Sequence, residues 1–116
     1  RLLASETASA RQLGERLVAD PSVRPKLLNE FAWILLTHPR VPTRDLDLAL
    51  RAARAAAARS GGRDPHILDT YARALNASGQ TREAIEQQRK AVAVASDPTF
   101  RTTLEQTLAG YQAQRP

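Results

Sequence analysis

The sequence predicts an all-α protein, a right-handed superhelical array of two helical hairpins framed by a leading helix and a closing helix. The first reason is a duplication, because residues 25–64 and residues 65–98 each read as two helices joined by a loop. The second is composition: 42% of the 116 residues are hydrophobic, with only one Trp, two Tyr and two Phe. A core of Leu, Ala and Val suits close-packed helices, and a chain of this length supports a single small domain.

Residues 1–24 are expected to hold the leading helix, which is clearest from 9 to 19. Leu13 and Leu17 lie four residues apart, the spacing of one helical face, so we expect them to form its apolar side. Asp20 and Pro21 then end the helix, since proline cannot continue it.

The hairpin at 65–98 has a clear start and a clear turn. Asp64 can cap its first helix, and Pro65 fits the first helical position, where no amide hydrogen bond is needed. Gly79 can take the left-handed conformation that closes this helix. The residues expected to face inward are Leu68, Tyr71, Ala72 and Leu75, followed by Ala84, Ile85, Ala91, Val92 and Ala95.

The segment 25–64 repeats this pattern. A shift of 40 positions places Ala32 on Ala72, and a shift of 35 places Ala49 on Ala84. Its expected parts are a helix at 25–37, a longer loop with two prolines at 38–43, and a helix at about 43–60. Two independent copies of one pattern favour a repeat architecture over chance amphipathic helices.

The closing helix is expected within residues 99–116, introduced by Asp97 and Pro98. Its apolar stripe consists of Phe100, Leu104, Leu108 and Tyr111. A two-repeat array leaves its apolar ends exposed, and an amphipathic terminal helix is the usual way to cover one of them.

Small residues stand at the spacing of the tetratricopeptide repeat: Ala72, Gly79, Ala84 and Ala91. The hairpin therefore resembles that family, and with Pro65 as position one a repeat of the family's 34-residue length ends at Pro98. Gln88 stands where the family usually has a large apolar residue, which predicts a weaker seam between neighbouring repeats there. The resemblance implies an α-α superhelix and a non-catalytic role in docking or scaffolding other proteins.

The resemblance also implies a concave groove, into which positions two, five, nine and twelve of each first helix project. In this chain those positions are Lys26, Asn29, Trp33 and Leu36, then His66, Asp69, Arg73 and Asn76. Asn29 and Trp33 replace the Lys and Asn that grip a C-terminal carboxylate in some members, so no such clamp is expected. Trp33 is the best single anchor, because indoles are enriched at binding hot spots. The alternatives are that Trp33 packs under the proline loop and that Asp69 pairs with Arg73.

A narrower resemblance covers nearly the whole chain. The wording LNEFAWILLT, RDLDLALRAA, ILDTYARAL and SGQTREAIEQQRKAV is similar to the helical tail behind a thioredoxin-like domain in some bacterial proteins. This would imply a neighbouring domain with a redox Cys-x-x-Cys and a periplasmic location; the chain alone leaves the location open. The sequence starts at Arg1 and contains no methionine, so we expect it to be part of a longer polypeptide.

The net charge is +5, and 15 of the 17 cationic residues are arginine. Four of them gather within roughly 140° on the side of the 43–60 helix opposite its alanines; these are Arg44, Arg51, Arg54 and Arg59. They could form an anion-binding stripe or an ordinary solvated face, and the interleaved Asp47 favours the solvated face.

Residues for catalysis are scarce. The chain has no cysteine, hence no disulfide, thiolate zinc site or thiol nucleophile. His38 and His66 each lack a second histidine within a turn, so no metal site of usual spacing is expected. His66 and Asp69 could share a face as an acid–base pair, but a helix N-terminus with ordinary surface residues explains both. We therefore expect no enzyme, no cofactor and no membrane-spanning segment, since no apolar run reaches ~18 residues.

Three hypotheses of function follow. The first is a protein-interaction module that docks a peptide, a partner or its own neighbouring domain. The second is a nucleic-acid-binding module that uses the four arginines, with affinity falling steeply as salt rises. The third is an accessory domain of a thioredoxin-like oxidoreductase. Weak self-association through Leu2, Leu3 or the closing stripe is compatible with each.

Overall fold

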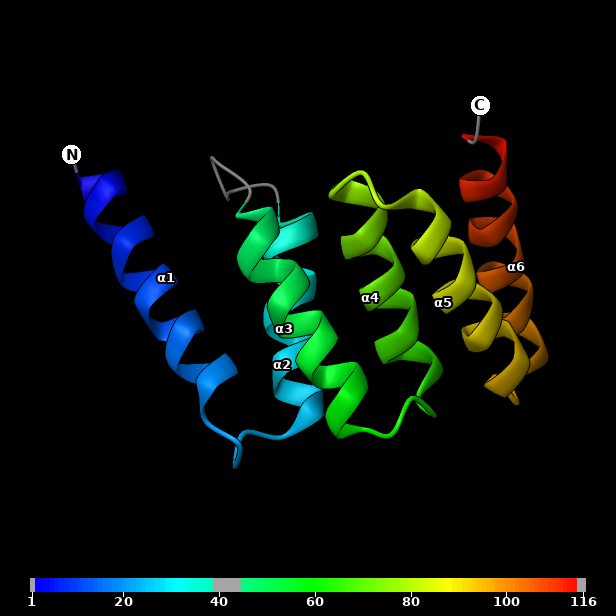
Figure 1. The fold of residues 1–116 in the computed structure, drawn as a ribbon, viewed down its shortest axis with the longest axis horizontal. Helices are drawn as coiled ribbons and strands as arrows, with labels where there is room; N and C mark the ends of the chain where they lie inside the picture. Colours follow the sequence, from blue (N-terminus) through cyan, green and yellow to red (C-terminus); the bar gives the residue numbers. More distant parts are fainter. Residues whose placement is uncertain (1, 39–44, 115–116) are drawn as a thin grey trace.

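The computed structural model describes residues 2–38 and 45–114, with side chains from residue 11 onward. Within those ranges it contains six helices and no strand, which confirms the all-α prediction (Figure 1). The helices are α1 (Leu2–Ala19), α2 (Pro25–Thr37), α3 (Leu46–Arg59), α4 (Pro65–Ala77), α5 (Thr81–Val94) and α6 (Pro98–Ala113). Arg44 and residues 39–43 of the predicted proline loop lie outside the described residues.

Short polar caps and prolines set the starts of four helices. Proline occupies the first turn of α2, α4 and α6, where its missing amide proton costs nothing. The Asp64 carboxylate accepts from the backbone amides of His66 at 2.9 Å and Ile67 at 3.4 Å, as its predicted capping role requires. Asp45 accepts from the amide of Leu48 at 3.1 Å. This cap explains why α3 begins at Leu46.

Glycine closes one helix in each half of the molecule. Gly79 has a φ of 85°, and the amide of Gln80 donates to the carbonyl of Leu75 at 2.8 Å, the geometry of a Schellman turn. This turn joins α4 to α5, as predicted. Gly61 and Gly62, with φ of 76° and 68°, close α3 in a similar way.

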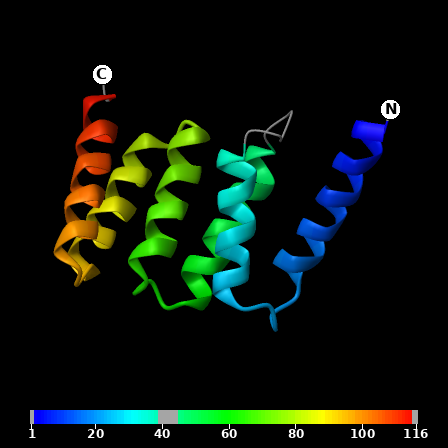
Figure 2. The same ribbon diagram turned by 180° about the vertical axis from the view of Figure 1, so that it is seen from behind.

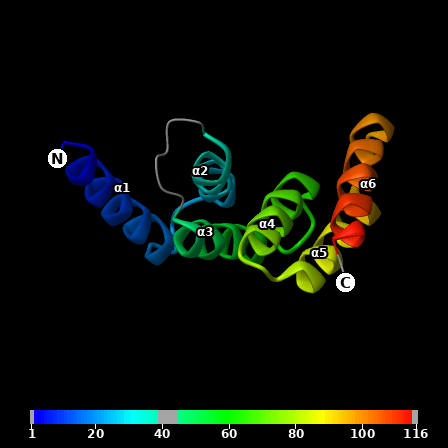
Figure 3. The ribbon, with the colours of Figure 1, turned by 90° about the horizontal axis from the view of Figure 1, so that it is seen from above.

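In Figure 1 the molecule runs from α1 at one end to α6 at the other, with α2 behind α3. From above, α2, α4 and α6 lie on one side of the molecule, while α3 and α5 lie on the other (Figure 3). Consecutive helices from α2 to α6 pack against each other, and α2 also contacts α4 directly. Figure 2 looks onto the side formed by α2, α4 and α6.

The two hairpins bury equivalent positions. Equivalent apolar pairs with at most 1% of their surface exposed include Leu28 and Leu68, Ala32 and Ala72, Ala49 and Ala84, and Ala56 and Ala91. Burial of these alanines confirms the inward sides predicted for the hairpin helices. Leu104 of α6 joins Leu68, Ala91 and Ala95 in one buried cluster, so α6 covers the end of the second hairpin.

The prediction for the apolar side of α1 was wrong at Leu13, which is 55% exposed. Leu17 packs against the core as predicted, together with its neighbour Val18. Between them and the exposed Leu13, Gly14 is buried, and a Cβ at that position would lie 2.5 Å from Cζ of Phe31. The absence of a side chain at Gly14 therefore lets α1 approach α2 and α3 closely, which rotates Leu13 outward.

Candidate docking groove

A groove of about 490 Å³ lies between α2, α4 and α6. It brings together five of the eight residues that the sequence placed in a binding groove: Asn29, Trp33, His66, Asp69 and Arg73. The other lining residues are Glu30 and Ile34 of α2, Thr70 of α4, and Phe100, Thr103 and Thr107 of α6. The groove is thus lined by two first helices of the hairpins and by the closing helix.

The remaining three predicted residues do not line this groove. Leu36 packs against the buried cluster around Ala32. The Asn76 side chain accepts a hydrogen bond from the Thr81 hydroxyl at 2.9 Å, across the α4–α5 turn. Lys26 is exposed near the start of α2.

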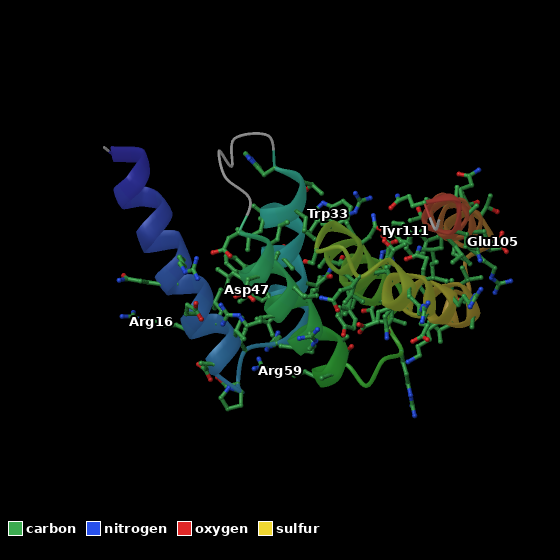
Figure 4. The ribbon with its side chains drawn as sticks, turned by 45° about the horizontal axis from the view of Figure 1, so that its top comes forward. Arg16, Trp33, Asp47, Arg59, Glu105 and Tyr111 are labelled. Carbon is green, nitrogen blue, oxygen red and sulfur yellow. The ribbon has the colours of Figure 1, made fainter. Side chains whose placement is uncertain are left out.

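Trp33 is 39% exposed and lies at the groove, on the side of α2 facing away from α1 (Figure 4). The guanidinium carbon of Arg73 stands 4.9 Å from the centre of a Trp33 ring, within the range of a cation–π contact. The contact links α2 to α4 through equivalent positions of the two hairpins. Arg73 therefore faces the indole, and the predicted Asp69–Arg73 ion pair is not among the contacts of the described side chains.

His66 and Phe100 connect α4 to α6. Their ring centres are 4.2 Å apart and their planes differ by 16°, a stacked arrangement. The carboxylate of Asp69 accepts from Nε2 of Gln88 at 3.0 Å. His66 thus contacts an aromatic ring, and Asp69 contacts an amide. The two residues do not form with each other the acid–base pair that their spacing in the sequence allowed.

Gln88 is fully buried, although the family resemblance favours a large apolar residue at its position. Its Nε2 donates both to Asp69 and to the backbone carbonyl of Leu104 at 3.2 Å. Gln88 of α5 therefore ties α4 to α6 and fixes one Asp69 oxygen. Within the described part of the chain, its own Oε1 has no hydrogen-bond partner.

Tyr111 lies behind these groups and is 7% exposed. Burial raises the pKa of its hydroxyl above the usual value of 10.0, because the phenolate would lose its hydration. Arg73 lowers this pKa and Asp69 raises it, both more weakly than burial. Two groove residues of opposite charge thus act on the same buried hydroxyl.

The arginines of the predicted basic face make contacts within the chain. Arg51 grips the Glu15 carboxylate with Nη1 at 2.6 Å and Nη2 at 2.9 Å, and its Nε donates to Asp47 at 3.1 Å. The hydrogen bond from Arg51 lowers the pKa of Glu15 below 4.5. These contacts fasten α1 to α3.

Arg59 and Arg54 are also engaged. The guanidinium of Arg59 donates to three backbone carbonyls at and beyond the end of α1, at 2.7 Å to Val18 and at 3.0 Å to both Asp20 and Val23. Nε of Arg54 donates to the Tyr71 hydroxyl at 3.2 Å. Figure 4 shows Arg59 and Asp47 on the α3 side that faces α1. Arg44, the fourth predicted member, lies outside the described residues.

Sequence reasoning missed the contribution of α6 to the groove. The closing helix was expected to cover an apolar end, and its threonines were not assigned a role. Thr103 and Thr107 lie four residues apart, next to the stripe residues Leu104 and Leu108, so they share one helical side. That spacing was a usable signal, but only the packing of α6 beside α4 shows which side faces the groove.

Comparison of the chain with protein-family models, with curated proteins and with solved structures gave no match. Among the described residues, no group of three or more His, Cys, Asp or Glu side chains is placed to hold a metal ion. No described helix combines the length and the apolar character needed to cross a membrane.

Proposed function

We propose that this chain is a non-catalytic protein-interaction module, made of two tetratricopeptide-like hairpins with a leading and a capping helix. It docks a peptide, a protein partner or a neighbouring domain of its own polypeptide in the groove between α2, α4 and α6. The observation that carries the proposal is the half-exposed indole of Trp33 at a groove formed by three helices.

The repeat assignment is supported by the matching burial of the two hairpins. Ala32 and Ala72 are both fully buried, as are Ala49 and Ala84, at the positions where small residues mark close helix contacts in that family. An α-α superhelix of this type presents its first helices along one side. The packing of α2 beside α4 agrees with such an arrangement.

The docking role is supported by the chemistry of the groove. It combines flat aromatic surfaces, Trp33 and Phe100, with a small number of charged and amide groups. Partner sites have this composition, because aromatic residues supply contact area at low entropic cost while polar groups fix orientation.

A selection of displayed peptides against the folded domain tests the proposal. Binders should lose about tenfold or more in affinity on Trp33→Ala, since hot-spot truncations cost ~2 kcal/mol or more. Val94→Ala is the matched control, because Val94 of α5 is 40% exposed and does not line the groove. Circular dichroism confirms that both variants keep their helices. Binders that tolerate Trp33→Ala, or that fail on Val94→Ala, would contradict the proposed site.

The nucleic-acid hypothesis stays a proposal with less support, because Arg51 and Arg59 are held by contacts to α1. Binding to mixed oligonucleotides that falls steeply with salt would favour it, and no detectable binding at ~50 mM salt would end it. The thioredoxin-like neighbour is a separate proposal about the full polypeptide. A Cys-x-x-Cys in the sequence preceding Arg1 would support it.

A further inference from the structure

The groove carries a charge opposite in sign to that of the whole protein. Its charged lining residues are Glu30, Asp69 and Arg73, which sum to −1 with His66 neutral, while the chain carries +5. Glu30 is exposed and has no ion-pair partner among the described side chains. A ligand that enters this groove therefore meets a local excess of negative charge.

The uncharged groups of the groove add hydrogen-bond acceptors. The hydroxyls of Thr70 and Thr107 each donate to the carbonyl four residues earlier, at 3.1 Å, and Thr103 does the same at 3.4 Å. A hydroxyl has a single proton, so these three oxygens can only accept a further hydrogen bond. Oδ1 of Asn29 is buried and has no hydrogen-bond partner among the described residues. Each of these four atoms can accept a hydrogen bond from an N–H or O–H group of a ligand.

The indole of Trp33 shows which kind of donor group the groove accommodates. The guanidinium of Arg73 stands 4.9 Å from a ring centre, and tryptophan is the most favourable ring for such a contact. Arg73 is nevertheless exposed to solvent, and it has no ion pair with Asp69, four residues earlier on the same helix. The aromatic face of the groove is thus already in contact with a cation, and that cation is Arg73, one of the groove's own lining residues.

We propose that the groove recognises a Lys or Arg side chain on an extended protein segment, and that Arg73 occupies the place of that cation until the segment binds. This inference rests on the docking function proposed above and specifies the chemistry of the docked segment. The ligand cation would lie near Trp33, with Glu30 and the free oxygen of Asp69 as its counter-charges. Displacement of Arg73 is part of binding.

Trp33 is the only tryptophan in the chain, so its fluorescence reports on binding in the groove. Short capped peptides that share one neutral sequence and differ only in a central Lys, Arg, Gln or Glu are titrated while Trp33 fluorescence is followed. The Lys and Arg peptides should bind more tightly than the Gln peptide, and the Glu peptide should bind most weakly. Added salt should reduce the preference, because the counter-charges are partly exposed.

Three variants sharpen the test. Glu30→Gln should weaken binding of the Lys and Arg peptides about three- to tenfold and leave the Gln peptide unchanged. Arg73→Ala should strengthen binding of the cationic peptides about fivefold, because it removes a like charge and frees the indole face. Glu86 of α5 is also an exposed carboxylate, but it lies outside the groove. Glu86→Gln should therefore change the affinity for the cationic peptides and for the Gln peptide by no more than twofold.

The possible results separate the two proposals. Tighter binding of the Glu peptide, or loss of binding on Arg73→Ala, would overturn the charge inference and leave the docking groove in place. Equal binding of all four peptides would do the same. If no peptide, and no binder from the display selection, changes Trp33 fluorescence, both the inference and the proposed docking site are wrong.

Discussion

The two end helices of this molecule are held in different ways. The leading helix α1 is fastened to α3 chiefly by charged contacts at the surface, such as Arg51 with Glu15 and Arg11 with Asp45 at 2.8 Å, while Leu17 and Val18 are only partly buried against the core. The closing helix α6 is held by buried side chains, with Leu104 1% and Tyr111 7% exposed. Exposed ion pairs stabilise proteins little, whereas a buried leucine stabilises strongly. We therefore expect α6 to be part of the stable core and α1 to be its loosest element.

This difference matters for the docking function that we propose, because α6 lines the groove and α1 does not. A docking surface needs a preorganised frame, since ordering side chains and helices during binding reduces affinity. The groove lies at the better-packed end of the molecule, where Gln88 also joins α4 to α6.

The largest expected effect comes from truncating the buried leucine of α6. Leu104→Ala should lower the free energy of unfolding by about 2–5 kcal/mol, because it leaves a cavity beside Leu68 and Ala91. Leu13→Ala in α1 is the matched control, and it should change stability by less than ~0.5 kcal/mol, since Leu13 is mostly exposed. Urea unfolding measures both. Similar losses in the two variants would refute the contrast between the end helices.

Each end helix contains a glycine, so a second pair of variants can compare α1 with α6. Gly14→Ala should destabilise by about 1–3 kcal/mol, because the new methyl group would lie 2.5 Å from Phe31 and 2.7 Å from Leu48 side-chain carbons. Gly110→Ala in α6 meets open space and should stabilise by about 0.5–1 kcal/mol through helix propensity. Thermal unfolding compares the two. If Gly14→Ala is also stabilising, α1 does not pack as closely as described.

Acid should loosen α1 before the rest of the molecule. The folded-state pKa of Glu15 is lowered by its hydrogen bond from Arg51, so the stabilisation is present above the unfolded value of 4.5. It is lost as pH falls through the lowered pKa. The protection of the α1 amides, measured by NMR relative to the intrinsic exchange rate at each pH, should fall in this window. Glu15→Gln should remove the response; acid loosening that begins in α6 would count against it.

High pH should destabilise the α6 end of the molecule, and we expect this effect on stability to be the smallest of those predicted. Burial raises the folded-state pKa of Tyr111 above 10.0, so its contribution to stability is complete below that pH. It declines as pH rises through the raised value, because the unfolded chain ionises first. Tyr111→Phe should remove this part of the alkaline destabilisation, as measured by denaturant midpoints. An unchanged alkaline profile in the variant would show that Tyr111 is not the group responsible.

Local signals in the sequence were sufficient to predict where the helices begin and end. Proline in the first turn, an aspartate cap such as Asp64 and the left-handed Gly79 are short-range features, so they place helix ends without knowledge of packing. The duplicated alanines also identified the buried faces. Five of the eight residues that the sequence assigned to a groove line the one between α2, α4 and α6, because α2 and α4 occupy equivalent positions in the two hairpins.

What could not be predicted depends on how helices cross. Gly14 has no distinctive local pattern, yet its missing side chain sets the approach of α1 and turns Leu13 to solvent. Thr103 and Thr107 of α6 line the groove only because that helix packs on α5 and also reaches α4, where Phe100 stacks on His66. The buried Gln88 was expected to weaken a seam, but its partners on α4 and α6 could be identified only from the structure.

Native-state hydrogen exchange is the most direct test of a rigid groove with a loosely held leading helix. Amides of α4, α5 and α6 should exchange only through global unfolding, so their opening free energies should equal the value from denaturant titration. Amides of α1 should open at a lower free energy, and more readily as salt is raised. Opening of α6 at or below the free energy of α1 would contradict both the contrast between the two ends and the preorganised groove.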